Sequence, residues 1–433
     1  MKLGGKSGHQ QQATASKDNY SSWLVVSLAE VTRECRSRNN GQLDDKLLCG
    51  VLKSHGLVPM RERVKGDSTD RCKLVAPNAF AYNPMRLNIG SIARNTADRR
   101  VMVSPDYVVF QTDPERVLPN YLDHVRYSGL WKSYVGATGD GSVRVRIYYD
   151  QLSNFQLPLP PLPEQQKIST ILTAVDAKLD VIARQIETTQ SLKMGLMKTL
   201  FRRGVGTENV NGSWIPHTEL KDSELGDIPV GWKVRTLESV ATVERGKFSA
   251  RPRNDPKYFE NGDIPFVQTG DIASVPRYIE NASQFLNADG LAVSKRFPAG
   301  TILITIAANI GDVAIAKIPM TCPDSLVGIK ANSDECDNIW LYYQLANNKD
   351  YFDSKSTQNA QKNINLQVLK PFLLALPSLT EQHRIAEVLT ALDDKLEVLV
   401  SRQTQYQTLK RGLMQKLLTG EWRVKLDSPS CIA

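Results

Sequence analysis

One stretch of sequence occurs twice and decides the fold: Pro160-Pro161-Leu162-Pro163-Glu164-Gln165 returns as Pro377-Ser378-Leu379-Thr380-Glu381-Gln382. The two copies are 217 residues apart, and at the same displacement Gly195-Leu196-Met197 matches Gly412-Leu413-Met414. No gap interrupts the register between these landmarks. A self-match at so long a period is typical of duplicated domains rather than of a solenoid of short repeats. The chain is therefore predicted to be a tandem duplication.

The duplication extends upstream of each copy, to a shared pattern of one tryptophan and three aliphatic residues. The pattern comprises Trp23, Val25, Leu28 and Val31 in one half, and Trp232, Val234, Leu237 and Val240 in the other. Its displacement is 209 residues, so the loops in between differ in length. We therefore expect these segments: a flexible tail (1–22), lobe 1 (23–158), a long helix (159–205), a linker (206–231), lobe 2 (232–375), a second long helix (376–422) and a C-terminal tail (423–433).

Apolar residues behind each copy recur alternately four and three residues apart, which is the 3.5-residue period of a coiled-coil seam. The seam comprises Ile168, Leu172, Val175, Leu179, Ile182 and Ile186, and again Ile385, Leu389, Leu392, Leu396 and Leu399. Gly204 and Gly420 mark the expected helix ends. A helix of about 38 residues is about 57 Å long, and its apolar stripe needs a partner. We predict that the two helices pair with each other; the alternative is that each stripe packs on its own lobe.

The lobes are predicted to mix strands and helices. Strand-like runs cover 107–111, 264–268, 301–306, 312–316 and 326–329, and helices are expected over 120–127 and 339–352. The expected fold class is α+β. Two such lobes would be joined by two long helices in an antiparallel coiled coil, with pseudo-two-fold symmetry from the internal duplication.

The composition is that of a globular protein with a basic surplus: 433 residues, a formal net charge of +8 and a pI near 9.0. Such a surplus favours polyanionic partners, because lysines and arginines that neutralise phosphates release counterions. The six cysteines lack the short paired spacings of zinc or redox sites, so we expect no metal. No apolar run approaches the roughly 18 to 20 residues that cross a bilayer. We therefore expect a cytoplasmic protein without a membrane partner.

Catalytic signatures are absent from the sequence, which has no G-x-x-x-x-G-K-[ST], H-E-x-x-H or G-x-S-x-G. Gly4-Gly5-Lys6-Ser7 lacks the first glycine and the preceding strand of a phosphate loop. Asn254-Asp255-Pro256-Lys257-Tyr258 is similar to the motif of amino-methyltransferases, but a lysine stands where the second proline would be, which favours a turn. We expect no catalytic residue and no cofactor.

Basic and amide side chains gather on polar loops of both lobes, and such groups bridge to phosphates and to base edges. The candidate DNA-binding residues are Arg94, Asn95, Arg99, Arg100, Arg144 and Arg146 in lobe 1, and Arg245, Lys247, Ser249, Arg251, Arg253, Gln268, Thr269, Asn309, Gln361, Lys362 and Asn363 in lobe 2. The alternative is that these loops are solvated charge runs and turns. Because Ala308 stands opposite Arg94 in the duplication, we expect the lobes to make different contacts and to recognise different sequences.

These features resemble the specificity subunits of type I restriction-modification systems, over nearly the whole chain from Trp23. The most specific elements are the Pro-x-Leu-x-Glu-Gln motifs at Pro160 and Pro377, the Gly-Leu-Met motifs at Gly195 and Gly412, and Gly226-Asp227-Ile228-Pro229-Val230-Gly231-Trp232. Lobe 1 departs from the pattern, because no Gly-Asp-Ile-Pro precedes its tryptophan.

The resemblance implies that each lobe is a target recognition domain for one half of a split, asymmetric double-stranded DNA site, with the paired helices setting the distance between the halves. It implies two methylation subunits, which carry S-adenosylmethionine chemistry, and restriction subunits, which carry ATP-driven translocation and cleavage. This chain would then bind neither cofactor and have no activity alone. Two alternatives stay open: a partner in which methylase and nuclease are one chain, and a coiled-coil scaffold whose lobes bind protein.

Overall fold

The computed structural model describes residues 23–53, 55–60, 68–138, 146–356 and 362–426. It divides into two compact units, Met1–Ala183 with Ser401–Ala433, and Arg184–Val400. The first unit holds lobe 1 and the second holds lobe 2. Because the boundaries fall inside the two long helices, each unit also contains one half of each helix. The helices are α5 (Leu162–Arg203) and α12 (Leu379–Leu418).

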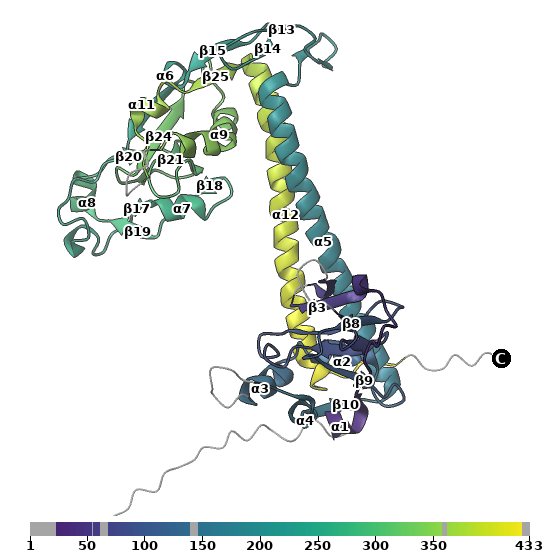
Figure 1. Cartoon of the computed structure of the whole chain (residues 1–433). Helices are drawn as coiled ribbons and strands as arrows, with labels where there is room; N and C mark the ends of the chain where they lie inside the picture. Colours follow the sequence, from purple (N-terminus) through teal and green to yellow (C-terminus); the bar gives the residue numbers. More distant parts are fainter. Residues whose placement is uncertain (1–22, 54, 61–67, 139–145, 357–361, 427–433) are drawn as a thin grey trace, which may run out of the picture. The chain divides into compact units, whose positions relative to one another are not determined.

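Lobe 1 is built from two four-stranded sheets, ordered β2-β9-β6-β7 and β4-β3-β8-β5, with helices beside them (Figure 1). Its elements are β1 (Leu24–Ser27), α1 (Leu28–Val31), β2 (Thr32–Glu34), a 3₁₀ turn (Asp45–Leu47), β3 (Leu48–Leu52), β4 (Gly56–Pro59), β5 (Lys73–Val75), β6 (Phe80–Tyr82), β7 (Ile92–Arg94), β8 (Val101–Val103), β9 (Val108–Thr112), α2 (Pro119–Val125), α3 (Gly129–Ala137), α4 (Tyr149–Leu152) and β10 (Gln156–Leu159).

Lobe 2 has a five-stranded sheet, β16-β24-β21-β22-β18, and a four-stranded sheet, β19-β17-β23-β20. Its elements are β15 (Lys233–Thr236), α6 (Leu237–Val240), β16 (Ala241–Arg245), a 3₁₀ turn (Pro256–Tyr258), β17 (Ile264–Phe266), α7 (Thr269–Ala273), β18 (Tyr278–Ile279), β19 (Gln284–Leu286), α8 (Ala288–Ala292), β20 (Arg296–Phe297), β21 (Ile302–Thr305), β22 (Val313–Ala316), β23 (Met320–Thr321), β24 (Leu326–Ala331), α9 (Asn338–Asn347), α10 (Lys349–Ser354), α11 (Leu366–Leu369) and β25 (Leu373–Leu376). The linker carries the short strands β11 (Thr207–Glu208), β12 (Trp214–Ile215), β13 (Leu220–Lys221) and β14 (Ile228–Pro229).

The first and last strands of each lobe pair with each other. β1 lies antiparallel to β10, with Leu24 opposite Leu159, and β15 lies antiparallel to β25, with Lys233 opposite Leu376. Both pairs end directly before the Pro-x-Leu-x-Glu-Gln motif. The start of each lobe is therefore held beside the start of the long helix that follows it.

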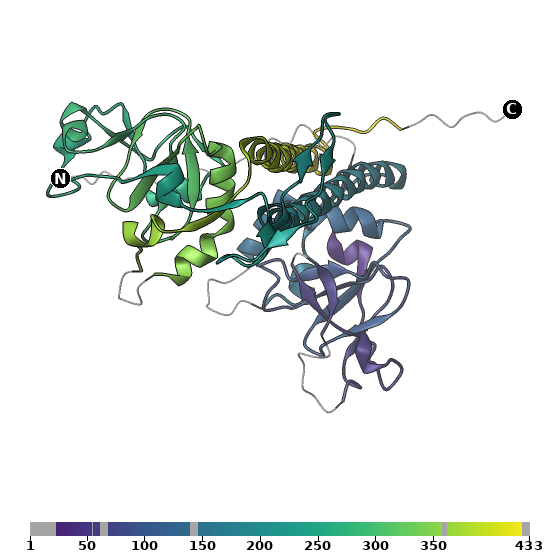
Figure 2. The same cartoon turned by 90° about the horizontal axis from the view of Figure 1, so that it is seen from above.

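The two long helices run antiparallel within each unit and lie side by side in Figures 1 and 2. In the first unit, Ile168 at the start of α5 shares a buried cluster with Met414 at the end of α12. In the second unit, Leu200 at the end of α5 shares a buried cluster with Ile385 at the start of α12. The predicted α+β fold class with two long helices is confirmed.

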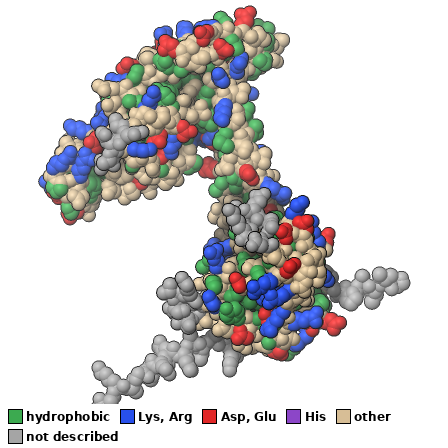
Figure 3. Space-filling model, in the orientation of Figure 1, with side chains coloured by type: hydrophobic (Ala, Val, Ile, Leu, Met, Phe, Trp, Pro, Cys, Tyr) green, Lys and Arg blue, Asp and Glu red, His purple; other side chains and the backbone are tan. Residues whose placement is uncertain are grey.

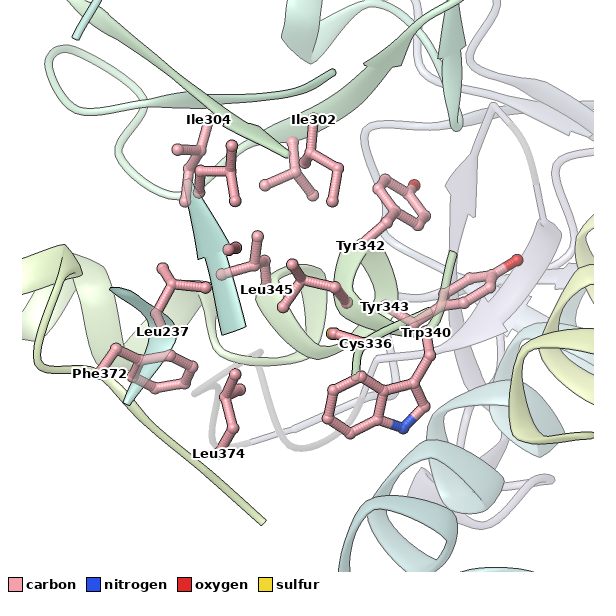
Figure 4. Packing of buried hydrophobic residues seen from close by; sticks show 14 of the residues in the cluster. Leu237, Ile302, Ile304, Cys336, Trp340, Tyr342, Tyr343, Leu345, Phe372 and Leu374 are labelled. Carbon is pink, nitrogen blue, oxygen red and sulfur yellow. The ribbon is translucent and has the colours of Figure 1, made fainter. Parts of the chain in front are cut away.

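The predicted seam residues are all at least partly buried. Ile168, Leu172, Ile182, Ile385, Leu389 and Leu399 are buried, and Val175, Leu179, Ile186, Leu392 and Leu396 are half-buried. The seam packs on the lobes as well as on the partner helix, because Trp340 and Tyr343 of α9 share a buried cluster with Leu389 of α12. Figure 4 shows Trp340 and Tyr343 in this cluster. The two packing alternatives raised by the sequence therefore coexist.

Most predicted strands and helices occur with small shifts of their ends. The run expected over 264–268 is a strand only as far as Phe266, because Gln268 already forms the N-cap of α7. The helix expected over 339–352 is divided at Asn348, which ends α9 and precedes α10. Among the described residues, no helix combines the length and apolarity that crossing a bilayer would take.

Candidate nucleic-acid interface

The repeated Glu-Gln dipeptide fixes each lobe to its helix. Glu164 accepts a hydrogen bond from the indole nitrogen of Trp23 (3.0 Å), and Glu381 accepts one from that of Trp232 (2.9 Å). All four side chains are buried. The two halves of the duplication are therefore joined to the helices by the same contact, although about 140 to 150 residues separate the partners in sequence.

The glutamine of the motif holds the residue directly before one helix of each lobe, α2 in lobe 1 and α9 in lobe 2. The Gln165 carboxamide oxygen accepts from the backbone N–H of Leu118 (2.9 Å), directly before α2, and its nitrogen donates to Pro160 (2.8 Å). Gln382 accepts from the N–H of Asp337 (2.7 Å), directly before α9, and donates to Pro377 (3.0 Å). The motif thus orients a lobe helix as well as the lobe entrance.

The side chain that contacts the buried glutamate differs between the halves. Arg423 makes a bidentate contact with Glu164, with both nitrogen–oxygen distances at 2.7 Å. Burial raises the pKa of Glu164, but the hydrogen bonds from Arg423 and Trp23 outweigh it and hold this pKa below its usual value. Glu381 instead contacts the imidazole of His217 at 3.0 Å and accepts from the backbone N–H of Val205 and Gly206.

The glycines predicted at the helix ends are required there. Gly204 has φ +69°, and a Cβ at this position would lie 1.9 Å from Glu381 Oε1 and 2.7 Å from the Trp232 ring. Gly420 has φ +74° and approaches the Trp23 ring. An L side chain would be strained in this left-handed conformation.

A second repeated contact joins the two long helices to each other. Asp176 of α5 pairs with Lys410 of α12 at 2.5 Å, and Asp393 of α12 pairs with Lys193 of α5 at the same distance. The residues are equivalent in the duplication. Each aspartate also lies near a side chain of its lobe.

Different lobe side chains meet these two aspartates. In lobe 1, His124 bonds Thr173 Oγ1 at 3.0 Å and its other ring nitrogen lies 4.0 Å from Asp176. Burial lowers the pKa of His124, and the nearby Asp176 opposes this shift. In lobe 2, the hydroxyl of Tyr343 donates to Asp393 (2.7 Å).

Two of the lobe 1 candidates are engaged inside the lobe. Arg94 donates to Asn78 (2.6 Å) and contacts Asp123 (3.3 Å), and its side chain is 15% exposed. Asn95 is 3% exposed and donates to the carbonyls of Val75 (3.0 Å) and Arg99 (2.9 Å). Both side chains therefore stabilise the lobe itself.

The other lobe 1 candidates are exposed where the structure describes them. They are Arg99, Arg100 and Arg146, while Arg144 lies outside the described residues. These arginines are accessible to a phosphate.

The basic loop of lobe 2 at 245–253 has a defined conformation. The backbone N–H of Lys247 donates to Cys322 (3.0 Å), and that of Ser249 donates to Val293 (3.0 Å). Gly246 is tightly enclosed, because a Cβ there would lie 2.2 Å from the Pro323 carbonyl. The loop is therefore seated on the sheet.

Asp324 contacts two arginines of this loop. Arg245 Nε donates to the Asp324 carbonyl (2.6 Å), and Arg253 Nη2 pairs with its carboxylate (2.9 Å). Arg251 donates to the Ala250 carbonyl (2.7 Å). Arg245, Lys247, Ser249, Arg251 and Arg253 are all exposed, which leaves unused donor groups for a ligand.

A cavity of about 660 Å³ joins this loop to the end of β17. Its lining brings the candidates Arg253 and Gln268 together with aromatic rings and further amides: Phe248, Asn254, Pro256, Phe259, Asn261, Gly262, Phe266, Ser283, Gln284, Phe285, Pro323 and Ser325. Phe248 and Phe266 pack with ring centroids 4.9 Å apart. Figure 3 shows Lys and Arg side chains over the end of lobe 2 that carries α8.

The segment from Asn254 to Tyr258 is a turn, as predicted. The Asp255 side chain accepts from the N–H of Lys257 (3.1 Å) and so caps a 3₁₀ turn. Asn254 and Pro256 line the cavity.

The remaining lobe 2 candidates lie on other loops. Thr269 opens α7 and is half-buried, whereas Asn309 and Asn363 are exposed on segments joined by a bridge between Ala307 and Asn363. Lys362 is exposed and 3.6 Å from Asp353. Gln361 lies outside the described residues.

No group of three or more metal-ligating side chains occurs among the residues that the structure describes.

Gln284 was missed in the sequence, because a single glutamine in a polar stretch carries no signal. The buried glutamates were recognised only as repeat landmarks, since their partners are distant in sequence.

The family model described as "Type I restriction modification DNA specificity domain" matches residues 129–189 and 229–405. The chain is 32% identical over 372 residues to the MjaX type I restriction enzyme specificity subunit of Methanocaldococcus jannaschii, covering 84% of this chain and 83% of that one. The MjaVIII specificity subunit of the same organism is 30% identical over 308 residues, covering 68% and 67%. The crystal structure of a type I restriction-modification S subunit from M. genitalium shares the fold, with a TM-score of 0.58 at 14% identity over 93% of this chain and 97% of that one.

Proposed function

The chain belongs to the family of type I restriction-modification DNA specificity subunits, and we propose that it reads a bipartite, asymmetric DNA target with one lobe on each half-site. The subunit is a DNA-recognition component and not the catalytic one. The observation that carries the proposal is the duplicated anchor, in which Trp23–Glu164 and Trp232–Glu381 hold two differently equipped lobes. Because the anchors are the same and the lobes differ, we expect the two halves of the DNA target to differ as well.

Phosphate contacts would position each lobe, and amide side chains would read bases. The exposed cations available for this are Arg99, Arg100 and Arg146 in lobe 1 and Lys247, Arg251, Arg253 and Lys362 in lobe 2. Thr269, Asn309 and Asn363 add polar groups to the lobe 2 surface. The net charge of +8 supports the same reading.

The long helices would dock the methylation and restriction subunits. Val181 and Leu192 of α5 are 40% and 51% exposed, and their duplicated equivalents Val398 and Leu409 are 50% and 48% exposed. Exposed aliphatic side chains are typical of an interface. Since the set occurs twice, it fits two copies of one methylation subunit.

Sequencing of genomic methylation in a host that carries this chain with its methylation partner tests the proposal. We expect a single motif with two short defined halves and an undefined spacer. A continuous or palindromic motif would contradict an asymmetric reading by two unlike lobes. The isolated chain should incorporate no labelled methyl group and cleave no DNA.

The salt dependence of binding distinguishes the scaffold alternative from DNA recognition. Binding that rests on phosphate contacts weakens log-linearly with salt, whereas an apolar protein interface does not. Neighbouring reading frames will distinguish a separate methylase and nuclease from a fused chain.

A further inference from the structure

Two glutamines meet at the cavity of lobe 2. The Gln268 carboxamide nitrogen donates to the Gln284 carboxamide oxygen at 3.0 Å, and both residues line the cavity beside Arg253. β17 and β19 are antiparallel, with Phe266 opposite Gln284. Gln268, two residues beyond Phe266, still has an extended backbone (φ -99°, ψ 166°), so side-chain alternation continues to it and it emerges on the same face as Gln284.

The backbone under this pair is held in place. The Asp271 carboxylate accepts from the N–H of Gln268 (2.8 Å) and from the hydroxyl of Ser283 (3.1 Å), which precedes Gln284. The N–H of Val267 donates to Thr321 in the adjacent strand β23 (2.8 Å). The two carboxamides are therefore positioned before any ligand arrives, which reduces the entropy lost on binding.

Their mutual hydrogen bond leaves a defined pattern for a ligand. One carboxamide oxygen is used as an acceptor and one N–H as a donor, so the other oxygen and the other amide group remain free. The same result follows whichever glutamine donates. The pair therefore always presents one wholly unused carboxamide oxygen, an acceptor, beside one wholly unused amide group, a donor.

One base edge in the major groove matches this pattern. Adenine presents the N6 donor beside the N7 acceptor, whereas guanine presents two acceptors, cytosine a donor and thymine an acceptor with a methyl group. We propose that the Gln268–Gln284 pair reads the major-groove edge of one adenine in the half-site of lobe 2. The inference rests on the proposed function. Arg253, in the same cavity, is placed to hold a phosphate beside that base.

The test replaces single adenines by 7-deazaadenine, in which N7 becomes C–H while the Watson–Crick edge is unchanged. The Kd of the complex with its methylation partner is measured at fixed salt, for each adenine of the lobe 2 half-site in turn. We expect one position at which the wild-type affinity falls roughly 5- to 150-fold, the range of one bidentate contact. Gln284→Ala should lose a similar factor on normal DNA and lose nothing more on the 7-deaza DNA.

Gln367→Ala is the matched control, because Gln367 is exposed on α11 of the same lobe and does not line the cavity. It should bind both DNAs as the wild type does. Losses from Gln284→Ala and from 7-deazaadenine that multiply would show independent contacts and overturn the inference, as would specific binding that is insensitive to N7 everywhere in this half-site. An adenine read only through its Watson–Crick edge would give that second result. A wild-type complex without any sequence preference would instead overturn the proposed function itself.

Discussion

At the scale of single residues, one position on the lobe–helix contact is occupied by a histidine in lobe 1 and by a tyrosine in lobe 2. His124 faces Asp176, and Tyr343 donates to the equivalent Asp393. Burial raises the pKa of Tyr343, so its hydroxyl stays protonated at any ordinary pH. Only lobe 1 therefore carries an acid-sensitive contact at this position.

The first prediction concerns the pH dependence of this contact. Because burial lowers the pKa of His124 below its ordinary 6.5, the neutral imidazole stabilises the folded state. That contribution is present above pH 6.5 and is lost as the pH falls through the lower folded value. His124→Tyr, which copies lobe 2, should flatten the fall in the denaturant midpoint of the first unit between pH 7.5 and 5.5. Equal slopes for the two proteins would contradict this account.

The second prediction tests the basic loop at 245–253. Arg251→Ala with Arg253→Ala should weaken DNA binding and reduce the slope of log K against log salt by up to about two units, since each phosphate contact contributes about 0.9. Fluorescence anisotropy over a salt series measures this. Arg235→Ala, on β15 of the same lobe, is the exposed control and should leave the slope as in the wild type. An unchanged slope in the double variant would place the loop away from DNA.

At the scale of elements, the long helices are part of each lobe core and also carry the exposed aliphatic side chains that we propose as the partner interface. Leu389 of α12 is fully buried in the cluster that also contains Trp340, Tyr343 and Leu200. Leu409, on the same helix, is 48% exposed. The two leucines therefore separate the core face from the exposed face.

The third prediction compares these leucines. Leu389→Ala should lower the free energy of unfolding by about 2 to 5 kcal/mol, because it removes buried contacts and leaves a cavity. Leu409→Ala should change it by less than about 0.5 kcal/mol. Urea denaturation measures both changes. A loss for Leu389→Ala as small as that for Leu409→Ala would contradict the placement of the seam in the lobe core. In a pull-down, Leu409→Ala should reduce the amount of methylation subunit that is bound, although it leaves the free energy of unfolding almost unchanged.

At the scale of the whole molecule, the proposed ruler can be tested by lengthening α5 and α12 together. Met197 and Leu200 of α5 lie in the core of lobe 2, so an insertion near Arg202 would break that core. Insertions after Ala183 and after Val400, at the boundaries of the two units along the chain, avoid it.

The fourth prediction is that four residues added at both places lengthen the recognised spacer by one or two base pairs. Four helical residues add about 6 Å and a right-handed turn of about 40°. Two base pairs add about 7 Å and turn the DNA by about 70° in the same sense. Methylation sequencing should find the half-sites unchanged. Four residues inserted in the linker between Asn211 and Gly212 should leave the spacer as it is. An altered half-site, or an unaltered spacer at full activity in the helix variant, would refute the ruler.

The sequence by itself determined the duplication, the two long helices and the α+β class. These follow from patterns that are local or repeated: the 3.5-residue spacing from Ile168 to Ile186, the glycines at helix ends, and the return of Glu164-Gln165 as Glu381-Gln382. Such signals survive without knowledge of tertiary contacts, because each is found either among neighbours within a few turns of helix or by comparing the two copies directly.

Only the tertiary structure decided which polar side chains are available to a ligand. The sequence predicts Asn95 as a DNA-binding residue, but its carboxamide nitrogen donates to the carbonyls of Val75 and Arg99 inside the lobe. Gln284 carried no signal until the register of β17 and β19 set it against Gln268. A polar group's role depends on which donors and acceptors reach it within about 3 Å, and residues distant in sequence decide that.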